Sequence, residues 1–495
     1  MMDLNLAAPE MPDAMSQLNA LKERPTPETA EDFAALEDEA ARLGHLAAAE
    51  VLAHHLKTAH SDRKFVNSAV RQAREKAQKR LRKCGKRQVE ITLPGGHGVV
   101  VSTPYLLPDT SSKPGPRRKR GGRGKAGNGS FPVLVKLGII DKTTPRLRFM
   151  AALQLVMSDS YECALSNLAE MGAPMTDRAM VRHSLSTASA MMALRDESLE
   201  HALEASEPSE LPLYGRRVMI STDGGRVKVK LPNTRGRRRK SGRRGFVTEW
   251  REPKGIIIQV LDEEGRPDKK VAPVIDFTMG DKEEAFRLLK RYMKALGGAY
   301  AEQVLLVADG AEWIWNRADG LREALGVEEG KYLKLLDFYH VCEYLSDAVE
   351  SCSGLNSYEK REEYKRLKGL LRRGMAFSVQ DALHELMETH GETEALVDAR
   401  RYIENHEDML DYPKARSQKL PIGSGAMESA VRRVVNLRFK GPGLIWSIYT
   451  IEPFMHLRAL VKSGRYEDMC KAVLRQMSQP LTHSAAQPES ERKAA

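Results

Sequence analysis

The sequence predicts a multidomain α+β protein in which a mixed α/β domain is preceded by helical regions and interrupted by a helical insertion. Three observations predict this fold class. Short apolar runs of strand length alternate with helical patterns between residues 211 and 345. Long stretches with helical spacing of apolar residues come before and after that part of the chain. At 495 residues, the chain is also too long for one ordinary core.

Positive charge is concentrated in two short stretches. The chain has 78 Lys and Arg against 67 Asp and Glu, a net charge of +11. Residues 113–125 hold seven Lys or Arg and residues 226–244 hold ten, with no acid in either stretch. These two stretches carry more charge than the net total, so the rest of the chain is acidic. The clustering predicts a polyanion-binding surface, and favours nucleic acid over a pair of solvated tails.

The cysteines and the apolar runs exclude several other classes of protein. Five cysteines lie far apart and form no Cys-x-x-Cys pair, which argues against a zinc ribbon or finger. No apolar run has membrane-spanning length, and no signal peptide is recognised. We therefore expect free thiols, no membrane partner, and a cytoplasmic, nucleoid-associated location.

The first 130 residues are predicted to form three parts. Residues 1–88 are an N-terminal helical region that ends in a basic helix over 61–87. Residues 89–110 are a β-hairpin, because two β-branched runs flank a Pro-Gly-Gly turn. Residues 111–130 are a basic linker by composition. The basic helix is either a solvated helical hairpin or an arm that lies along DNA or a partner subunit.

Residues 131–210 are predicted to be helical and to contain a helix-turn-helix. A short amphipathic helix ends at Gly172, and Thr176 is the expected N-cap of a second helix. Two helices joined across a glycine turn are typical of DNA-binding proteins, although generic helical hairpins share the pattern. In such a motif, Arg178 and Arg182 project from the second helix towards a major groove.

Residues 211–345 are predicted to form the first part of the mixed α/β domain. A β meander followed by βαβα units predicts a mixed sheet with helices on its faces. Residues 235–244 are expected to form a hairpin tip or loop. The expected strands cover 218–223, 255–261, 271–276, 304–309 and 332–337, and the expected helices cover 281–296 and 313–325.

The remaining residues are predicted to be helical. Residues 346–420 are highly charged and lack a strand signal, which predicts a helical insertion. Residues 421–478 are expected to supply the C-terminal helices of the interrupted domain. Residues 479–495 are polar and predict a disordered tail.

Three carboxylates stand where one sheet edge could gather them. Asp223 and Asp309 each end a buried strand and precede glycine, and Glu428 lies in the first turns of a helix that begins at Gly423-Ser-Gly. Mg²⁺ prefers oxygen ligands, and two such ions can activate an attacking oxygen and stabilise a leaving one. We interpret the glycines as letting a phosphate backbone approach. The set therefore predicts a divalent-metal site for phosphodiester chemistry.

Each of these signals also has an ordinary structural explanation. A strand that ends in Asp-Gly is more often a turn, and Glu428 alone would complement its helix dipole. Two other acids are rejected as ligands. Asp276 is predicted to end a strand but no glycine follows it, and Asp281 opens a helix N-terminal signature.

Three blocks of sequence carry a family resemblance. They are Asp309-Gly-Ala-Glu-Trp-Ile314, Gly423-Ser-Gly-Ala-Met-Glu428 and Arg438-Phe-Lys-Gly-Pro-Gly-Leu-Ile-Trp446. Through them the chain resembles the DDE transposases of bacterial insertion sequences, in the ISKra-type branch of the Mutator-like group. The resemblance covers roughly residues 145–465.

This resemblance implies an RNase H-like catalytic domain with a helical insertion. It implies that Asp223, Asp309 and Glu428 bind Mg²⁺ or Mn²⁺, as two ions. Members also carry a Cys- or Asp-x-x-His pair, which Asp337-Phe-Tyr-His340 matches. Asp337 and His340 are therefore expected near the site, where they would orient the DNA. The alternative is an N-cap aspartate and an ordinary helix histidine. The Cys-rich N-terminal zinc module that relatives often carry is not matched here.

The implied activity is metal-dependent cleavage of the DNA ends of an insertion sequence, followed by transfer of the 3′-OH to target DNA. The expected partners are terminal inverted repeats, target DNA, and further copies of the chain in a homodimer or larger assembly. The alternatives are a catalytically inactive domesticated DNA-binding protein, another RNase H-like nuclease, and a structural nucleoid-binding protein. The residues expected to contact DNA are Arg178, Arg182, Arg237, Arg238, Arg239, Lys240, Arg432, Arg433, Arg438 and Lys440.

Overall fold

The chain forms two compact units, which are described separately. A computed structural model describes residues 13–77, 79–109, 129–201, 207–232, 245–441 and 443–478. The first unit comprises Met1–Met191 with Glu467–Ala495, and the second comprises Met192–Tyr466. Helices occur with mixed sheets, which confirms the predicted α+β class. No helix of the described residues is long and apolar enough to span a membrane. Most of the predicted linker 111–130, the tail 479–495, and Arg237, Arg238, Arg239 and Lys240 lie outside the described residues.

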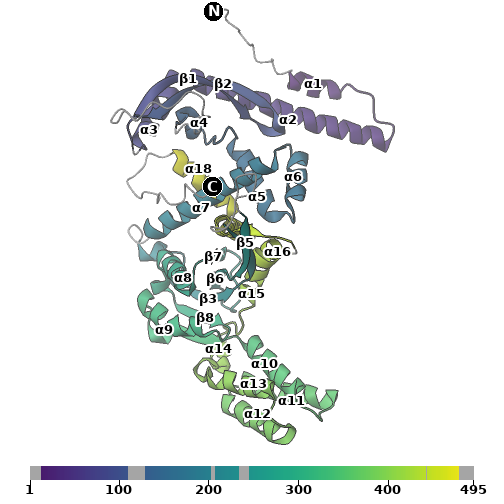
Figure 1. The fold of residues 1–495 in the computed structure, drawn as a ribbon, viewed down its shortest axis with the longest axis vertical. Helices are drawn as coiled ribbons and strands as arrows, with labels where there is room; N and C mark the ends of the chain where they lie inside the picture. Colours follow the sequence, from purple (N-terminus) through teal and green to yellow (C-terminus); the bar gives the residue numbers. More distant parts are fainter. Residues whose placement is uncertain are drawn as a thin grey trace, which may run out of the picture. The chain divides into compact units, whose positions relative to one another are not determined.

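The first unit contains a long two-stranded hairpin beside helix α2 (Figure 1). The hairpin is confirmed, but it begins earlier than predicted, and the basic helix expected over 61–87 is confirmed only over Arg63–Glu75. Helix α3 ends at Glu75, and strand β1 pairs with β2 from Leu81 onward. Pairing with a distant strand satisfies the backbone here and overrides local helix propensity. The elements are α1 (Ala14–Leu21), α2 (Ala30–Ser61), α3 (Arg63–Glu75), β1 (Leu81–Thr92), β2 (Gly98–Pro108), α4 (Pro132–Lys136), α5 (Pro145–Met157), α6 (Tyr161–Glu170), α7 (Asp177–His201) and α18 (Tyr466–Ser478).

Two capped helices are present where the helix-turn-helix is predicted. Helix α6 ends before Gly172, which has a left-handed φ of 69°. The Thr176 hydroxyl accepts a hydrogen bond from the Ala179 amide at 3.3 Å, as expected of an N-cap. Helix α7 then runs for 25 residues, much further than predicted. The fold of this segment fits the motif, and its binding to DNA stays a prediction.

The two units divide the chain differently from the predicted ranges. Residues 131–210 are predicted as one region, whereas the boundary between the units falls inside α7. Residues 421–478 are predicted together, whereas those from Glu467 onward belong to the first unit. There the Lys76 ammonium donates to the backbone carbonyl of Met477 at 3.1 Å, which ties α18 to the end of α3. Such contacts between distant segments have no local sequence signal.

The second unit is built on a five-stranded mixed sheet with the order β7-β6-β3-β8-β9. Strand β6 is antiparallel to its neighbours, and the other four strands run in one direction. The predicted strands are confirmed, although the one predicted over 271–276 begins three residues later. Helices α8 (Lys282–Leu296) and α9 (Glu312–Leu325) alternate with the last strands. The strands are β3 (Arg217–Gly224), β6 (Lys254–Leu261), β7 (Val274–Thr278), β8 (Gln303–Ala308) and β9 (Tyr332–Leu336).

A second, three-stranded sheet extends from the end of β3. Strand β4 (Val227–Pro232) pairs antiparallel with β5 (Phe246–Arg251), so these strands flank the residues predicted as a hairpin tip. Strand β10 (Trp446–Ser447) pairs in parallel with β4. This pairing places a short strand within residues 421–478, which are predicted to supply helices, and α17 (Ile451–Lys462) begins only after it.

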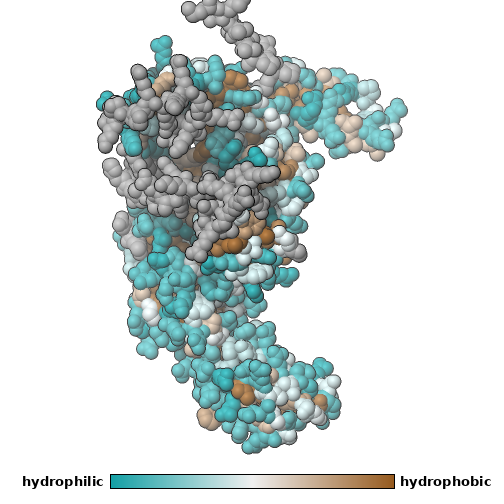
Figure 2. Space-filling view, viewed as in Figure 1, coloured by the Kyte–Doolittle hydropathy of each residue, from teal (hydrophilic) through white to brown (hydrophobic). Residues whose placement is uncertain are grey.

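The predicted insertion is helical throughout. It contains α11 (Ser357–Arg372), α12 (Ala376–His390), α13 (Glu394–Glu404) and α14 (Tyr412–Ser417), and it follows α10 (Phe338–Glu350). Figure 1 shows these helices grouped together beyond β8. Their visible face is mostly hydrophilic, with isolated hydrophobic residues (Figure 2). Their apolar sides pack into the same core as the five-stranded sheet.

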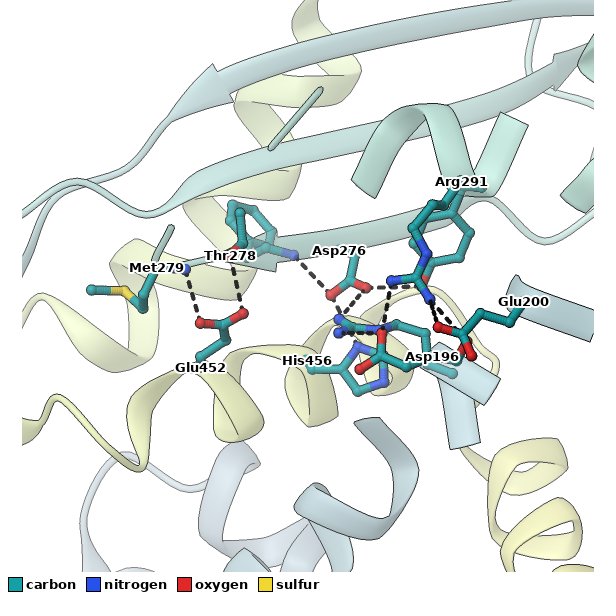
Figure 3. A network of polar contacts seen from close by, with 11 residues as sticks. Asp196, Glu200, Asp276, Thr278, Met279, Arg291, Glu452 and His456 are labelled. Carbon is teal, nitrogen blue, oxygen red and sulfur yellow. Dashed lines mark hydrogen bonds and ion pairs between the residues drawn. The ribbon is translucent and has the colours of Figure 1, made fainter. Parts of the chain in front are cut away.

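One face of the five-stranded sheet buries a charged network around Asp276 (Figure 3). The Asp276 side chain is fully buried and accepts hydrogen bonds from Arg195 at 2.9 Å, Tyr292 at 2.8 Å and His456 at 2.9 Å. Burial raises the pKa of Asp276, but His456 and Arg195 outweigh burial and hold it well below its ordinary value. Asp276 lies within β7 and does not end the strand, which corrects the prediction.

We predict that Asp276→Asn lowers the free energy of unfolding by about 3–5 kcal/mol, because Arg195 would then be buried without its charge partner. Asp319→Asn, at an exposed ion pair with Lys334, serves as the control and should cost about 1 kcal/mol or less. Urea unfolding measures both. Since the folded pKa of Asp276 is depressed, its stabilisation is present at neutral pH and is lost below about pH 4. Below about pH 4, the free energy of unfolding should fall more steeply for the wild type than for Asp276→Asn. Equal slopes would contradict this assignment.

Candidate functional site

Three aspartates form a row across adjacent parallel strands. Strand β3 pairs with β8 up to Ile220 and Leu306, and the same register carried three residues further relates Asp223 to Asp309. Strand β8 pairs with β9 in a register that relates Asp309 to Asp337 one residue beyond the last pair. Residues of one register row point to the same face of a sheet. The three carboxylates therefore lie on one face, at the carboxyl ends of three neighbouring strands.

Glu428 reaches this edge from a helix on the same face. It belongs to α15 (Gly425–Ala430), which packs against β3 and β6. Gly255 pairs with Asp223, and a Cβ on Gly255 would lie 2.5 Å from Met427 Cε. Met427, which precedes Glu428, thus packs against Gly255, which pairs with Asp223. Helix α15 continues into a π-helical segment, Val431–Asn436, of a kind often found at functional sites.

Two acids of this edge, Asp223 and Glu428, have a raised pKa. Burial, together with the charges of Asp309, Glu252 and Glu428, raises the pKa of Asp223 to about 6, against the effect of a hydrogen bond from the Gly224 amide. Burial also raises the pKa of the exposed Glu428, with Asp337 as the next cause. Carboxylates that repel one another in this way form an uncompensated negative site, which is a common mark of function.

Asp276 is excluded from this group by its position in the sheet. It pairs with Ile256, whereas its neighbour Phe277 pairs with Gly255, the partner of Asp223. Successive residues of a strand point to opposite faces, so Asp276 faces away from Asp223. The rejection of Asp276 as a ligand therefore agrees with the structure.

Asp337 has a structural function at the site's border. Its Oδ1 atom caps α10 by accepting from the amides of Tyr339 at 2.7 Å and His340 at 3.2 Å. Its Oδ2 atom accepts from the Ser424 amide at 2.7 Å and from the Ser424 hydroxyl. The N-cap alternative is thus confirmed, and the same side chain also fixes the loop before Glu428. Four donors occupy Asp337, which leaves it poorly suited to bind a metal ion.

His340 lies near Glu428 and stays a candidate site residue. It is one of the groups that lower the pKa of Glu428 against the effect of burial. Its Nδ1 atom lies 3.1 Å from a carboxylate oxygen of Glu343, and its side chain is 38% exposed. A role in orienting DNA stays a prediction.

The glycines after the two aspartates have packing reasons that differ from the expected one. A Cβ on Gly310 would lie 2.5 Å from the hydroxyl oxygen of Tyr402, and a Cβ on Gly225 would lie 3.0 Å from Val435. Protein side chains fill both positions. The expectation that these glycines let a phosphate backbone approach is therefore not supported at the glycine surfaces themselves.

Two residues that hold Asp309 in place escape local sequence reasoning. The Trp315 indole donates to the backbone carbonyl of Asp309 at 2.7 Å. Tyr402, from α13 in the insertion, packs its ring against Gly310. Trp315 directly follows the Asp309–Ile314 block, and nothing in the local sequence indicates its contact with Asp309. Tyr402 lies in a highly charged helical stretch, and nothing in the sequence around it indicates that it contacts Gly310.

The basic residues expected to contact DNA have different surroundings. Arg432, Arg433 and Lys440 are exposed on the second unit. Arg438 is only 2% exposed and lies 4.9 Å over the Trp446 ring, so its predicted contact with DNA is wrong for this fold. In the first unit, Arg178 is exposed, and Arg182 is exposed but lies 3.3 Å from Asp141.

A positively charged hollow adjoins the end of β3. It has a volume of about 480 Å³ and is bordered by Gly224, Arg226, Arg251, Glu252 and Lys440. A second hollow, of about 600 Å³, includes Glu428 in its lining. The basic residues of the first hollow would attract an anion next to the acidic edge.

The carboxylates fit a divalent cation in donor chemistry, charge and register. Hard cations such as Mg²⁺ bind carboxylate oxygens. Asp223 has other acidic side chains near it, and their negative charges would attract a cation. No group of three or more His, Cys, Asp or Glu among the described residues is preassembled to hold a metal ion. The fit is therefore one of residue type and of position at the strand ends, and Asp223, Asp309 and Glu428 are the residues that would supply oxygen donors.

No family model matches the chain, and a search of curated proteins found no match.

We predict that Gly310→Ala lowers the free energy of unfolding by about 1–3 kcal/mol, because the added methyl group meets the Tyr402 ring. The same substitution made in a Tyr402→Ala background should cost much less, since the colliding ring is gone. A double-mutant cycle in urea measures the coupling. Additive effects of the two substitutions would show that the ring and the glycine do not pack together.

Proposed function

We propose that the chain is a DNA transposase of the DDE type, and that the second unit is its RNase H-like catalytic domain. The observation that carries the proposal is the register row that relates Asp223 to Asp309, with Glu428 on the helix packed over the same face. The three residues come from two strands and a helix that lie far apart in the sequence. Their strand ends and helix adjoin one edge of the sheet, which supports the proposal.

The topology supports the RNase H-like assignment. Numbered in chain order, the five strands lie in the order 3-2-1-4-5, and only the second is antiparallel to the others. RNase H-like domains have this arrangement. The helices α10 to α14 stand between the fifth strand and the helix with Glu428, which matches a catalytic domain with an insertion.

Asp223, Asp309 and Glu428 would hold Mg²⁺ or Mn²⁺, as two ions. When bound, these ions would activate an oxygen nucleophile and stabilise a leaving oxygen. Asp223 and Asp309, at rigid strand ends, would fix the position of the reacting phosphate. Glu428, on an exposed helix turn, would complete the set from the other side of the edge.

The proposed reaction has two steps at this edge. Water attacks the phosphorus at an end of the element, the P–O3′ bond breaks, and a 3′-OH and a 5′-phosphate result. The freed 3′-OH then attacks a phosphodiester of target DNA, a new P–O bond forms, and the target's own 3′-OH leaves. Neither step needs a covalent bond between protein and DNA.

The distribution of charge supports DNA as the substrate. Arg226, Arg251 and Lys440 border the hollow next to Asp223, where a phosphate backbone would be attracted. Arg432 and Arg433 are exposed one helical turn beyond Glu428. The helix-turn-helix with Arg178 would recognise the terminal inverted repeats. Because two element ends must be held together, the working form is proposed to be a homodimer or larger assembly.

The carboxylates provide the direct test of the activity. Each of Asp223→Asn, Asp309→Asn and Glu428→Gln is expected to lower Mg²⁺- or Mn²⁺-dependent cleavage and joining by about a hundredfold or more. The assay uses a plasmid that carries the gene with its flanking DNA, and EDTA should abolish both products. Asp319→Asn, on the protein surface, is the matched control and should keep full activity.

The same assay separates the alternatives. Cleavage without strand joining would identify another RNase H-like nuclease. DNA binding with no metal-dependent reaction by the wild-type chain would favour an inactive DNA-binding protein. Activity that survives Asp309→Asn would contradict the proposed site.

The exposed arginine after Glu428 gives a second prediction. Arg432→Gln is expected to weaken binding about equally for all DNA sequences, and to reduce the slope of log K against log salt by about 1. The buried Arg438 makes no such contact, so any effect of Arg438→Gln should appear as lost stability. Fluorescence anisotropy over a range of salt concentrations measures the slopes. An unchanged slope for Arg432→Gln would remove this residue from the DNA interface.

A further inference from the structure

Tyr402 brings a hydroxyl group from the insertion to the backbone beside Asp309. It lies in α13, and its ring packs against Gly310, the residue directly after Asp309. A Cβ on Gly310 would lie 2.5 Å from the Tyr402 hydroxyl oxygen, so only a residue without a side chain admits the ring. The insertion thereby contacts the end of the strand that carries a proposed metal ligand.

The buried Tyr402 hydroxyl finds no acceptor for its proton within the described ranges, although the Gly310 amide approaches its oxygen and lowers its pKa. A buried donor without an acceptor lowers the stability of the fold, and such groups in native structures call for an explanation. Asp309 is the candidate acceptor, because the ring packs against the residue that follows it, and because its charge is, after burial, the largest cause that raises the pKa of Tyr402. Asp309 Oδ1 accepts from the Ala311 amide at 3.2 Å, and Oδ2 accepts no hydrogen bond from the described residues.

The direction of the Tyr402 ring is fixed by its neighbours. It stacks on Tyr344 of α10 at 4.1 Å between ring centroids, with 14° between the planes. The His406 ring lies 4.8 Å away, and its Nδ1 atom is 2.7 Å from the Tyr402 backbone carbonyl. A side chain held on several sides keeps its hydroxyl in one place. The donor is therefore preorganised before any ligand arrives.

We propose that Tyr402 is a positioning residue whose hydroxyl donates a hydrogen bond to the Asp309 carboxylate when a divalent cation is bound. This inference rests on the proposed function, because it takes Asp309 as a metal ligand. Carboxylates that bind metal ions are themselves hydrogen-bonded, and these partners orient them and raise metal affinity. Tyr402 would supply that partner from the insertion. The helical insertion is then part of the metal site as well as an addition to its surface.

Direct binding of Mn²⁺ to the full chain without DNA tests the inference. Tyr402→Phe keeps the ring and its stacking and removes only the hydroxyl. We expect it to weaken Mn²⁺ affinity, measured by titration calorimetry, by about 10–100-fold. Tyr344→Phe, in the stacked partner ring, is the matched control and should leave the affinity unchanged. The metal-free stability of Tyr402→Phe in urea should stay close to that of the wild type, since the hydroxyl donates to no described acceptor and only the Gly310 amide approaches its oxygen.

The outcomes distinguish this inference from the proposed function. If Asp309→Asn abolishes Mn²⁺ binding and Tyr402→Phe leaves it unchanged, the metal site is supported and the role of Tyr402 is overturned. An equal loss in Tyr344→Phe would assign the effect to the ring stack and overturn the role of the hydroxyl. A drop of metal-free stability in Tyr402→Phe would assign the hydroxyl a structural role and also overturn it. Mn²⁺ affinity that survives Asp309→Asn would overturn the proposed site itself.

Discussion

The parallel register of β3, β8 and β9 is the constraint on which the candidate site depends. It relates Asp223 to Asp309 and Asp309 to Asp337 in one row across the sheet. A slip of one residue in either pairing would turn a carboxylate to the other face. The apolar residues of these strands are almost completely buried, so the hydrophobic core fixes the register. Burial of ordinary aliphatic side chains thus places the polar ones.

The two faces of this sheet differ in whether a buried carboxylate has compensating partners. On one face, Asp276 is fully buried and compensated by Arg195, Tyr292 and His456. On the other face, Asp223 is partly buried beside further acids, and its pKa rises to about 6. A compensated acid contributes to the fold, whereas a repelled acid costs stability in the absence of a cation. This contrast is the electrostatic reason to look for function at Asp223.

The insertion and the site support each other through a few specific contacts. Asp337 joins the start of α10 to the loop before Glu428 by accepting hydrogen bonds from both. Tyr402 packs a ring of α13 under Gly310. The helices between β9 and α15 therefore connect the second and third acids in space as well as in sequence. Removing the insertion would remove a wall of the site.

The sequence by itself determined the five strands, the acids at their ends and the helical insertion, because strand length, glycine turns and helical period are local properties. Tertiary structure decided which strands pair and which distant segments contact each other. Distant pairing made a strand of residues 81–87, and burial withdrew Arg438 from solvent. Contact with Gly310 brought Tyr402 to Asp309. These outcomes depend on segments that meet only in the folded chain, where packing and hydrogen bonding between distant residues outweigh local preference.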